Sequence, residues 1–156
     1  MARGRHFIMR WPELGISVEC EPLEYNRGIY DWWLDHMPIK AVQSHAAVTG
    51  EVFYTLNIRL PEPAPAFARD ELKIDLMTSA PEGYGQFGYN ERGGLSGGRV
   101  GLVAVFYGPV HEAMDTCLSF KVIDEHIERV KRAGRAIWMA VYKTKQIITV
   151  ELSAKE

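Results

Sequence analysis

Residues Pro38 to Leu60, PIKAVQSHAAVTGEVFYTLNIRL, decide the fold, because they predict two β-strands that are joined at Thr49-Gly50. Polar and apolar side chains alternate in both halves, so that one face of each strand can be buried while the other stays polar. Phe53 interrupts the polar face of the second strand. The stretch therefore predicts a hairpin of a half-buried sheet and leaves the chemistry of the protein open.

The rest of the chain supplies further short strands and two helices. Apolar residues recur at a spacing of two in the predicted strands and of three or four in the predicted helices. Strands are predicted at residues 5–10, 16–21, 72–76, 100–107, 116–122 and 147–152, and helices at residues 26–37 and from 123 onward. Many short strands with only two helices predict a mainly β fold, a closed β-barrel with helices over its ends.

Gly134 leaves the length of the second helix open. Glycine costs about 1 kcal/mol relative to alanine inside a helix. The helix therefore either continues through Gly134 or ends there, and in the second case residues 136–142 form a strand.

The composition is that of a globular protein. At 156 residues the chain can bury roughly 70% of its unfolded surface, which predicts one domain over residues 1–156. Hydrophobic residues make up 47% and charged residues 24% of the chain. A net charge of −2 gives no bias toward nucleic acid, and no apolar run is long enough to predict a membrane partner.

The N-terminus and the cysteines predict a cytoplasmic protein. The stretch MARGRHFIMRW lacks the long apolar core of a secretory signal. Cys20 and Cys117 lie far apart in the sequence and form no CxxC pair, which is typical of a reducing compartment.

Two motifs resemble cofactor or metal sites only in part. Gly83 to Gly88 matches GxGxxG, but the following residues YNERGG cannot open the helix that would hold a pyrophosphate. His111-Glu112 begins an HExxH-like stretch that lacks the second histidine. We therefore expect a bulged strand and a loop at these places, with neither a cofactor nor a metal.

The candidate ligand site combines polar residues of the central hairpin with glycine-flanked aromatic residues. His45 is either a general acid or base or a hydrogen-bonded strand histidine, because its ordinary pKa lies near neutrality. The aromatic residues at 84–89 either line a pocket or pack around glycine kinks. The candidate ligand-binding residues are Gln43, His45, Glu51, Tyr54, Tyr84, Phe87 and Tyr89.

Four short stretches resemble the small bacterial proteins of unknown function that have a cyclophilin-like fold: WPELG at 11–15, VQSHA at 42–46, TGE at 49–51 with Tyr54, and YGP at 107–109. The resemblance runs along nearly the whole chain and implies a closed barrel with helices over its ends. It does not imply prolyl isomerase activity, because Ala46 stands where the arginine of true cyclophilins would lie. Losing one such donor commonly costs about 10²- to 10³-fold in rate.

Three functions follow as hypotheses. The first is binding of a small polar molecule between the strand at 41–49 and the segment at 84–89, with enzymatic activity left open and not expected. The second is prolyl isomerisation or proline-peptide binding, which rests on fold analogy. The third is a structural homo-oligomer, which four tryptophans and the apolar face of the second helix favour; a homodimer is expected.

Overall fold

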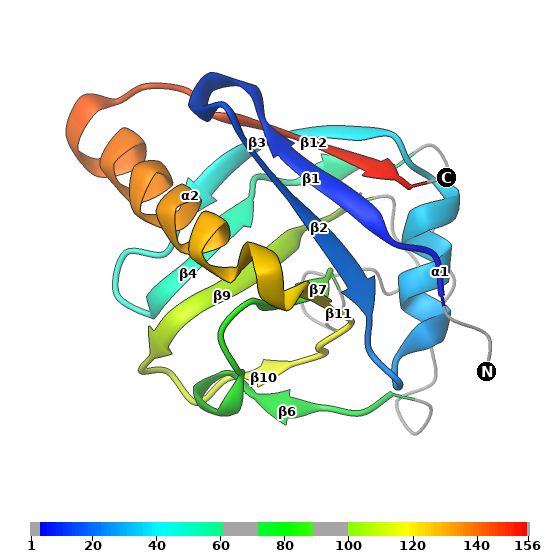
Figure 1. Ribbon diagram of the computed structural model, residues 1–156. Coiled ribbons are helices and arrows are strands. Elements are labelled where there is room, and N and C mark those ends of the chain that lie inside the picture. Colours follow the sequence, from blue (N-terminus) through cyan, green and yellow to red (C-terminus); the bar gives the residue numbers. More distant parts are fainter. Residues whose placement is uncertain (1–3, 61–71, 89–99, 156) are drawn as a thin grey trace.

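Eight antiparallel strands close into a barrel, in the order β1-β12-β3-β4-β9-β7-β11-β2 (Figure 1). This computed structural model describes residues 4–60, 72–88 and 100–155. The barrel strands are β1 (Phe7–Trp11), β2 (Ile16–Pro22), β3 (Ile39–His45), β4 (Gly50–Thr55), β7 (Tyr84–Phe87), β9 (Val103–Val110), β11 (Phe120–Val122) and β12 (Thr149–Ala154). The closed barrel predicted from the short alternating strands is confirmed.

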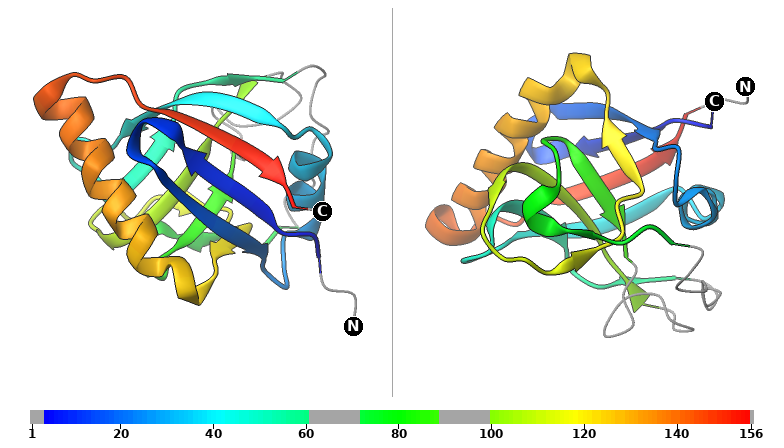
Figure 2. Two further views of the ribbon diagram at one scale, coloured as in Figure 1. Left: turned by 45° about the horizontal axis from the view of Figure 1, so that its top comes forward. Right: turned by 90° about the horizontal axis from the view of Figure 1, so that it is seen from below.

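In the described part of the chain, two α-helices lie at opposite ends of the barrel, as Figure 2 shows from two directions. They are α1 (Arg27–Asp35) and α2 (Ile127–Met139), and α2 continues into a π-helical turn, η5 (Ala140–Thr144). Two small antiparallel sheets pair β5 (Ile58–Arg59) with β8 (Val100–Gly101) and β6 (Asp75–Leu76) with β10 (Asp115–Thr116). Short 3-10 turns lie at η1 (Pro12–Leu14), η3 (Met77–Ser79) and η4 (Asp124–His126).

Aromatic side chains fill the barrel at the α1 end. The Phe87 ring stacks on Trp33 of α1, with 5.1 Å between the ring centroids and 9° between the planes. It also packs on Phe120 at 4.8 Å and on Phe7 at 5.3 Å. All four side chains have no exposed surface. This end of the barrel is therefore solid core, because aromatic rings contribute large buried areas.

Two polar residues of β3, Gln43 and His45, face the inside of the barrel. Gln43 is buried, whereas its neighbour Val42 is more than one-third exposed. Trp11 Nε1 donates a hydrogen bond to Gln43 Oε1 at 2.9 Å, and Gln43 Nε2 donates to the Tyr54 carbonyl at 3.0 Å. The buried amide is thus satisfied on both sides, which is what a polar group in a core requires.

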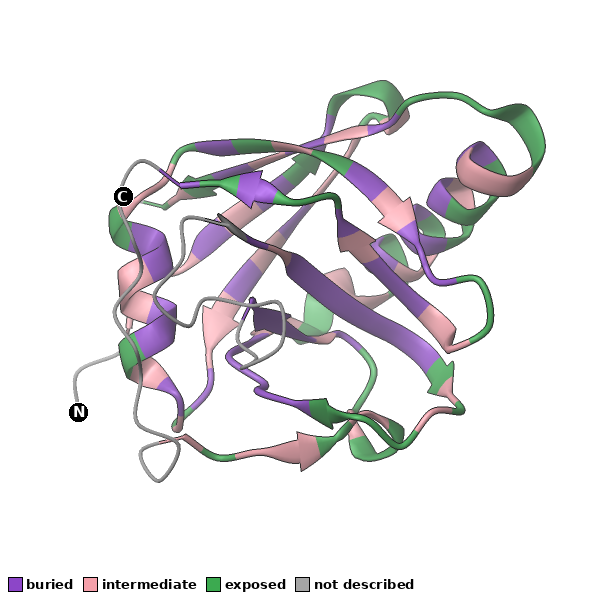
Figure 3. Ribbon diagram, turned by 180° about the vertical axis from the view of Figure 1, so that it is seen from behind, coloured by how far each residue is buried: buried purple, intermediate pink, exposed green. Residues whose placement is uncertain are grey.

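A second apolar cluster covers the outside of β4 and β9. It contains Val52, Phe106 and Leu118, while Phe53 and Val105 point into the barrel. Both faces of β9 are therefore buried along most of its length, as Figure 3 shows. Burial on both faces explains the continuous apolar run of β9. It also explains why Phe53 interrupts the polar face that the sequence predicted for β4.

Helix α2 continues through Gly134 to Met139, so the strand considered for residues 136–142 is not formed. A Cβ atom at Gly134 would lie 2.5 Å from Tyr107 Cε1, which is closer than carbon atoms approach. The glycine lets the helix backbone rest directly on the tyrosine ring. The cost in helix propensity is offset by this close packing.

Two predicted strands are shorter than expected. Of residues 72–76 only Asp75–Leu76 pair as a strand, and residues 116–122 split into β10 and β11. The interruption has a local cause, because the Cys117 amide donates to the side-chain oxygen of Gln86 at 3.2 Å and the Ser119 amide donates to the Gly85 carbonyl at 2.9 Å.

Within the described residues, no helix has both the length and the hydropathy needed to cross a membrane.

A carboxylate ties η1 to β12 and gives a prediction on acid stability. Glu13 accepts hydrogen bonds from the amide and the hydroxyl of Thr149, and the amide bond is the main cause that lowers its pKa. A group with a lowered folded-state pKa stabilises the fold above its unfolded pKa and loses this effect as the pH falls through the folded value. We expect Glu13→Gln to lower the free energy of urea unfolding at neutral pH by up to about 1 kcal/mol. The difference from the wild type should vanish in acid, and a constant difference would contradict the assignment.

Candidate functional site

A cleft of about 480 Å³ lies between the second half of α2 and the turn that joins β3 to β4. We call it the α2 cleft, and it lies at the barrel end away from α1 (Figure 1). Its lining combines five polar side chains with an aromatic and several apolar ones. The lining residues are His45, Ala46, Ala47, Val48, Gly50, Glu51, Tyr107, His111, Arg135, Trp138 and Met139.

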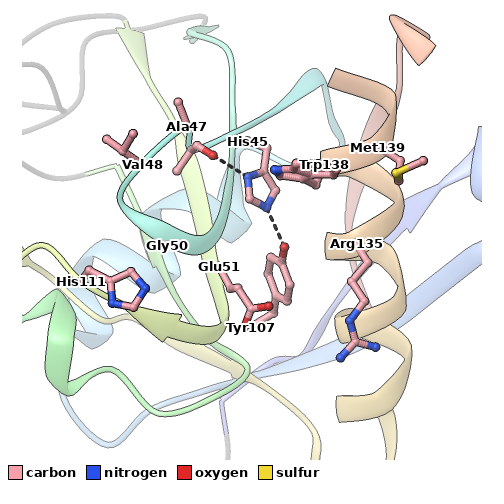
Figure 4. A pocket seen from close by; sticks show the side chains of 11 residues that line it. His45, Ala47, Val48, Gly50, Glu51, Tyr107, His111, Arg135, Trp138 and Met139 are labelled. Atoms are coloured by element: carbon pink, nitrogen blue, oxygen red, sulfur yellow. Dashed lines mark hydrogen bonds between the residues drawn. The ribbon is translucent and has the colours of Figure 1, made fainter. Parts of the chain in front are cut away.

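His45, the last residue of β3, is held by both ring nitrogens (Figure 4). Nδ1 lies 2.8 Å from the Ala46 carbonyl oxygen, and Nε2 lies 2.7 Å from the Tyr107 hydroxyl. Because a carbonyl only accepts, Nδ1 carries the proton. Burial lowers the pKa of His45, so the ring is neutral near pH 7 and Nε2 accepts from Tyr107.

The two charged residues of the cleft, Glu51 and Arg135, both influence the pKa of Tyr107. Burial and the Glu51 carboxylate raise the pKa of Tyr107 to about 12, while the Arg135 guanidinium opposes the rise. The hydroxyl therefore keeps its proton at neutral pH and donates a hydrogen bond to His45 Nε2. The site combines a protonated phenol, a neutral imidazole, an anion and a cation within one cleft.

Two glycines position Glu51 at the start of β4. Gly50 has a φ of 138°, and a Cβ atom there would lie 2.5 Å from the Pro109 carbonyl oxygen. The register with β9 shifts between Gly50 and Val52, which is the signature of a β-bulge and re-aims the residue between them. A Cβ atom at Gly108 would overlap Glu51 Oε2. The carboxylate therefore rests against the bare backbone of β9.

The apolar side of the cleft comes from α2 and the β3–β4 turn. Trp138 and Met139 are 37% and 46% exposed, and Val48 is 80% exposed. The Tyr142 hydroxyl in η5 donates to the His45 carbonyl at 2.6 Å and its ring packs on Trp138, with 5.8 Å between the centroids. The π-helical turn thus fixes the end of α2 to β3, and π-helical turns are often found at functional sites.

The structure brings two of the predicted site residues together and separates the others. His45 and Glu51 line the α2 cleft. Gln43 accepts a hydrogen bond from Trp11 inside the barrel, and Phe87 belongs to the core at the α1 end. Tyr54 and Tyr84 are half-buried against the cluster outside the barrel, and Tyr89 lies outside the described residues. The strand order explains the separation, because β4 and β9 lie between β3 and β7.

Five residues with side chains that matter for the cleft were not predicted from the sequence. Arg135, Trp138 and Met139 lie at i, i+3 and i+4 on α2, so they share one helical face, and this spacing was the available signal. Tyr107 lies in β9 and His111 follows it, and the sequence singled them out only within the YGP stretch and the HExxH-like stretch, not as ligand-binding residues. In the part of the chain that the structure describes, no group of three or more His, Cys, Asp or Glu residues is arranged to hold a metal.

No known protein-family model matches the sequence, and none of the curated proteins matches it. Among solved structures, the chain is similar to McbB in complex with tryptophan, with 30% sequence identity and a TM-score of 0.77. The similarity covers 96% of this chain and 44% of the McbB chain, so this chain spans less than half the length of McbB. The shared feature is the barrel with its two helices. The resemblance to small bacterial proteins with a cyclophilin-like fold stays a prediction.

Proposed function

We propose that the protein binds a small amphipathic molecule, an aromatic amino acid or a close derivative, in the α2 cleft. The observation that carries the proposal is the presence of an anion, a cation and an aromatic wall in one cleft: Glu51, Arg135 and Trp138. The volume of about 480 Å³ lies within the range of ligand pockets, roughly 300–1,000 Å³. McbB, which has a similar fold, was solved with tryptophan bound, and this supports the same class of ligand.

The charges of the cleft match those of an amino acid. The Glu51 carboxylate and the Tyr107 oxygen accept hydrogen bonds, so together they suit an ammonium group. Arg135 comes from the opposite wall, on α2, and a guanidinium binds a carboxylate through two parallel hydrogen bonds. A zwitterion therefore finds a partner for each of its charges.

The apolar rim suits an aromatic side chain. The Trp138 ring supplies a flat face, and Met139 supplies a flexible thioether that packs well on aromatic rings. The Tyr142 ring packs on the Trp138 ring, with 5.8 Å between the centroids, and this contact restrains the indole. Lys143 Nζ lies over the same ring, 5.7 Å from its centroid, which is within the range of a cation–π contact.

Calorimetric titration with tryptophan tests this proposal by comparing the affinity of the Glu51→Gln variant with that of the wild type. We expect the variant to bind tryptophan about 10- to 100-fold more weakly, the loss expected for one hydrogen bond to a charged group. The matched control is Glu128→Gln, because Glu128 is on the solvent side of α2 and 84% of its side chain is exposed. The control should bind as the wild type does.

Equal affinities of Glu51→Gln and the wild type would refute the assignment of the cleft. The same would follow if tryptophan, phenylalanine and tryptamine all failed to bind the wild type. Binding of a proline-containing peptide in their place would favour the prolyl hypothesis. The homodimer and the cytoplasmic location stay predictions, and light scattering measures the first.

A further inference from the structure

The Ala46 carbonyl sets the direction of a chain of hydrogen bonds that ends in the α2 cleft. The carbonyl accepts a hydrogen bond from His45 Nδ1–H, so the neutral ring has an unprotonated Nε2 that can only accept. The Tyr107 hydroxyl then donates its single proton to Nε2. What this oxygen presents to a ligand is its remaining lone pair. The floor of the cleft therefore accepts hydrogen bonds at Tyr107 as well as at Glu51.

We propose that protonation of His45 reverses the hydrogen-bond polarity of Tyr107 and so switches the α2 cleft from ligand groups that donate hydrogen bonds to groups that accept them. This inference rests on the proposed function and adds its regulation by pH. The donating group is an ammonium or amine, and the accepting group is a carboxylate or carbonyl.

The reversal follows from the number of protons in the chain. In the imidazolium form both ring nitrogens donate, so Nε2–H needs an acceptor and the Tyr107 oxygen is the group within reach at 2.7 Å. The O–H bond of Tyr107 must then rotate so that its hydrogen points away from the His45 imidazolium. The proton remains on the phenol, because the pKa of Tyr107 is raised to about 12. The hydroxyl now points its proton into the cleft.

The groups around His45 place the switch on the acid side of neutrality. Burial lowers the pKa of His45, and the Ala46 carbonyl and the Glu51 carboxylate of β4 partly oppose this. From η5, Tyr142 bonds the backbone carbonyl of His45 rather than its ring nitrogens. Arg135 of α2 and His111, which follows β9, line the same cleft. The net effect keeps the acceptor state at pH 7 and admits the donor state in acid.

Nitrogen NMR of the histidine rings reads the chain of hydrogen bonds without any ligand. For the full chain near pH 8, we expect His45 to show a protonated Nδ1 and an unprotonated Nε2. In acid both nitrogens should be protonated, with a midpoint below the ordinary histidine value of about 6.5. A neutral His45 with its proton on Nε2 would overturn the inference directly.

Two indole probes of opposite charge then measure the switch. Tryptamine carries an ammonium and indole-3-propionate carries a carboxylate, and both keep these charges from about pH 8 to about pH 5.5. We divide the association constant of tryptamine by that of indole-3-propionate. This ratio should fall by about tenfold or more as the pH is lowered through the His45 midpoint measured by NMR. In Tyr107→Phe, which keeps the ring and lacks the hydroxyl, the step should be clearly smaller, because only the charge of the imidazolium then acts on the two probes. His45→Gln, which cannot titrate, should remove the step entirely.

Glu51→Gln separates the switch from the direct interaction between the Glu51 carboxylate and the ligand. This variant should bind tryptamine more weakly at every pH and still show the step, now at its own His45 midpoint, which lies lower because the carboxylate that raises the pKa of His45 is gone. A step that disappears in Glu51→Gln, one of full size in Tyr107→Phe, or any step at the wild-type His45 midpoint in His45→Gln would overturn the switch. Binding of tryptamine with a ratio independent of pH would overturn the switch alone. Failure of both probes to bind at either pH would overturn the proposed function and the switch together.

Discussion

Replacing Phe87 with alanine is expected to lower the free energy of unfolding by about 3–5 kcal/mol, the usual loss for a phenylalanine removed from a core. The reason is that Phe87 has no exposed surface and stacks on Trp33 at the α1 end of the barrel. Phe120 and Phe7 close around the same ring and leave little room for the core to collapse. Urea unfolding followed by tryptophan fluorescence measures the loss.

Phe87→Leu keeps this prediction measurable if the alanine variant does not fold. Native proteins are stable by only about 5–15 kcal/mol, and leucine retains much of the buried volume. We expect Phe87→Leu to be less stable than the wild type and to bind tryptophan with unchanged affinity, because Phe87 lies outside the α2 cleft. A leucine variant with normal stability and lost binding would instead make Phe87 a ligand residue.

Gly134→Ala is expected to destabilise the protein by about 1–3 kcal/mol, although the same change would stabilise an isolated helix by about 1 kcal/mol. The new methyl group would lie 2.5 Å from the Tyr107 ring, which is buried between α2 and the barrel. Relief requires that the ring move and that its hydroxyl leave His45 Nε2. We therefore expect weaker tryptophan binding as well as a lower melting temperature.

A second substitution isolates the cause of the Gly134→Ala effect. In a Tyr107→Leu background the side chain is smaller, so Gly134→Ala should be neutral or stabilising, as helix propensity alone dictates. Arg132→Ala, on the polar face of α2, controls for general effects of alanine in this helix. A Gly134→Ala variant that is more stable than the wild type and binds normally would contradict the packing described for Tyr107.

Local patterns predicted the barrel well because alternation and apolar runs reflect burial that each strand experiences by itself. The hairpin around Gly50 and the buried strand β9 both follow from such patterns. What the patterns did not contain is which face is turned inward. Gln43 and His45 are polar and face the interior, because Trp11, Tyr107 and backbone carbonyls satisfy them there.

The residues that line the α2 cleft were predicted only in part because the cleft depends on contacts between distant segments. His45 and Glu51 are close to each other in sequence, so the central hairpin was enough to pair them. Tyr107 and Arg135 reach the same cleft through barrel closure and through the docking of α2 at Gly134. Tyr84 and Phe87 of the predicted partner segment lie on β7, which strand order separates from His45, and short-range patterns do not encode strand order.

The most direct measurement of the central claim is a structure of the protein crystallised with tryptophan. The account predicts that the ligand occupies the α2 cleft, with its ammonium group within hydrogen-bond distance of Glu51 and of the Tyr107 oxygen, and with its indole against Trp138. Tryptophan bound at the 84–89 segment, or a cleft that stays empty at saturating tryptophan, would contradict it.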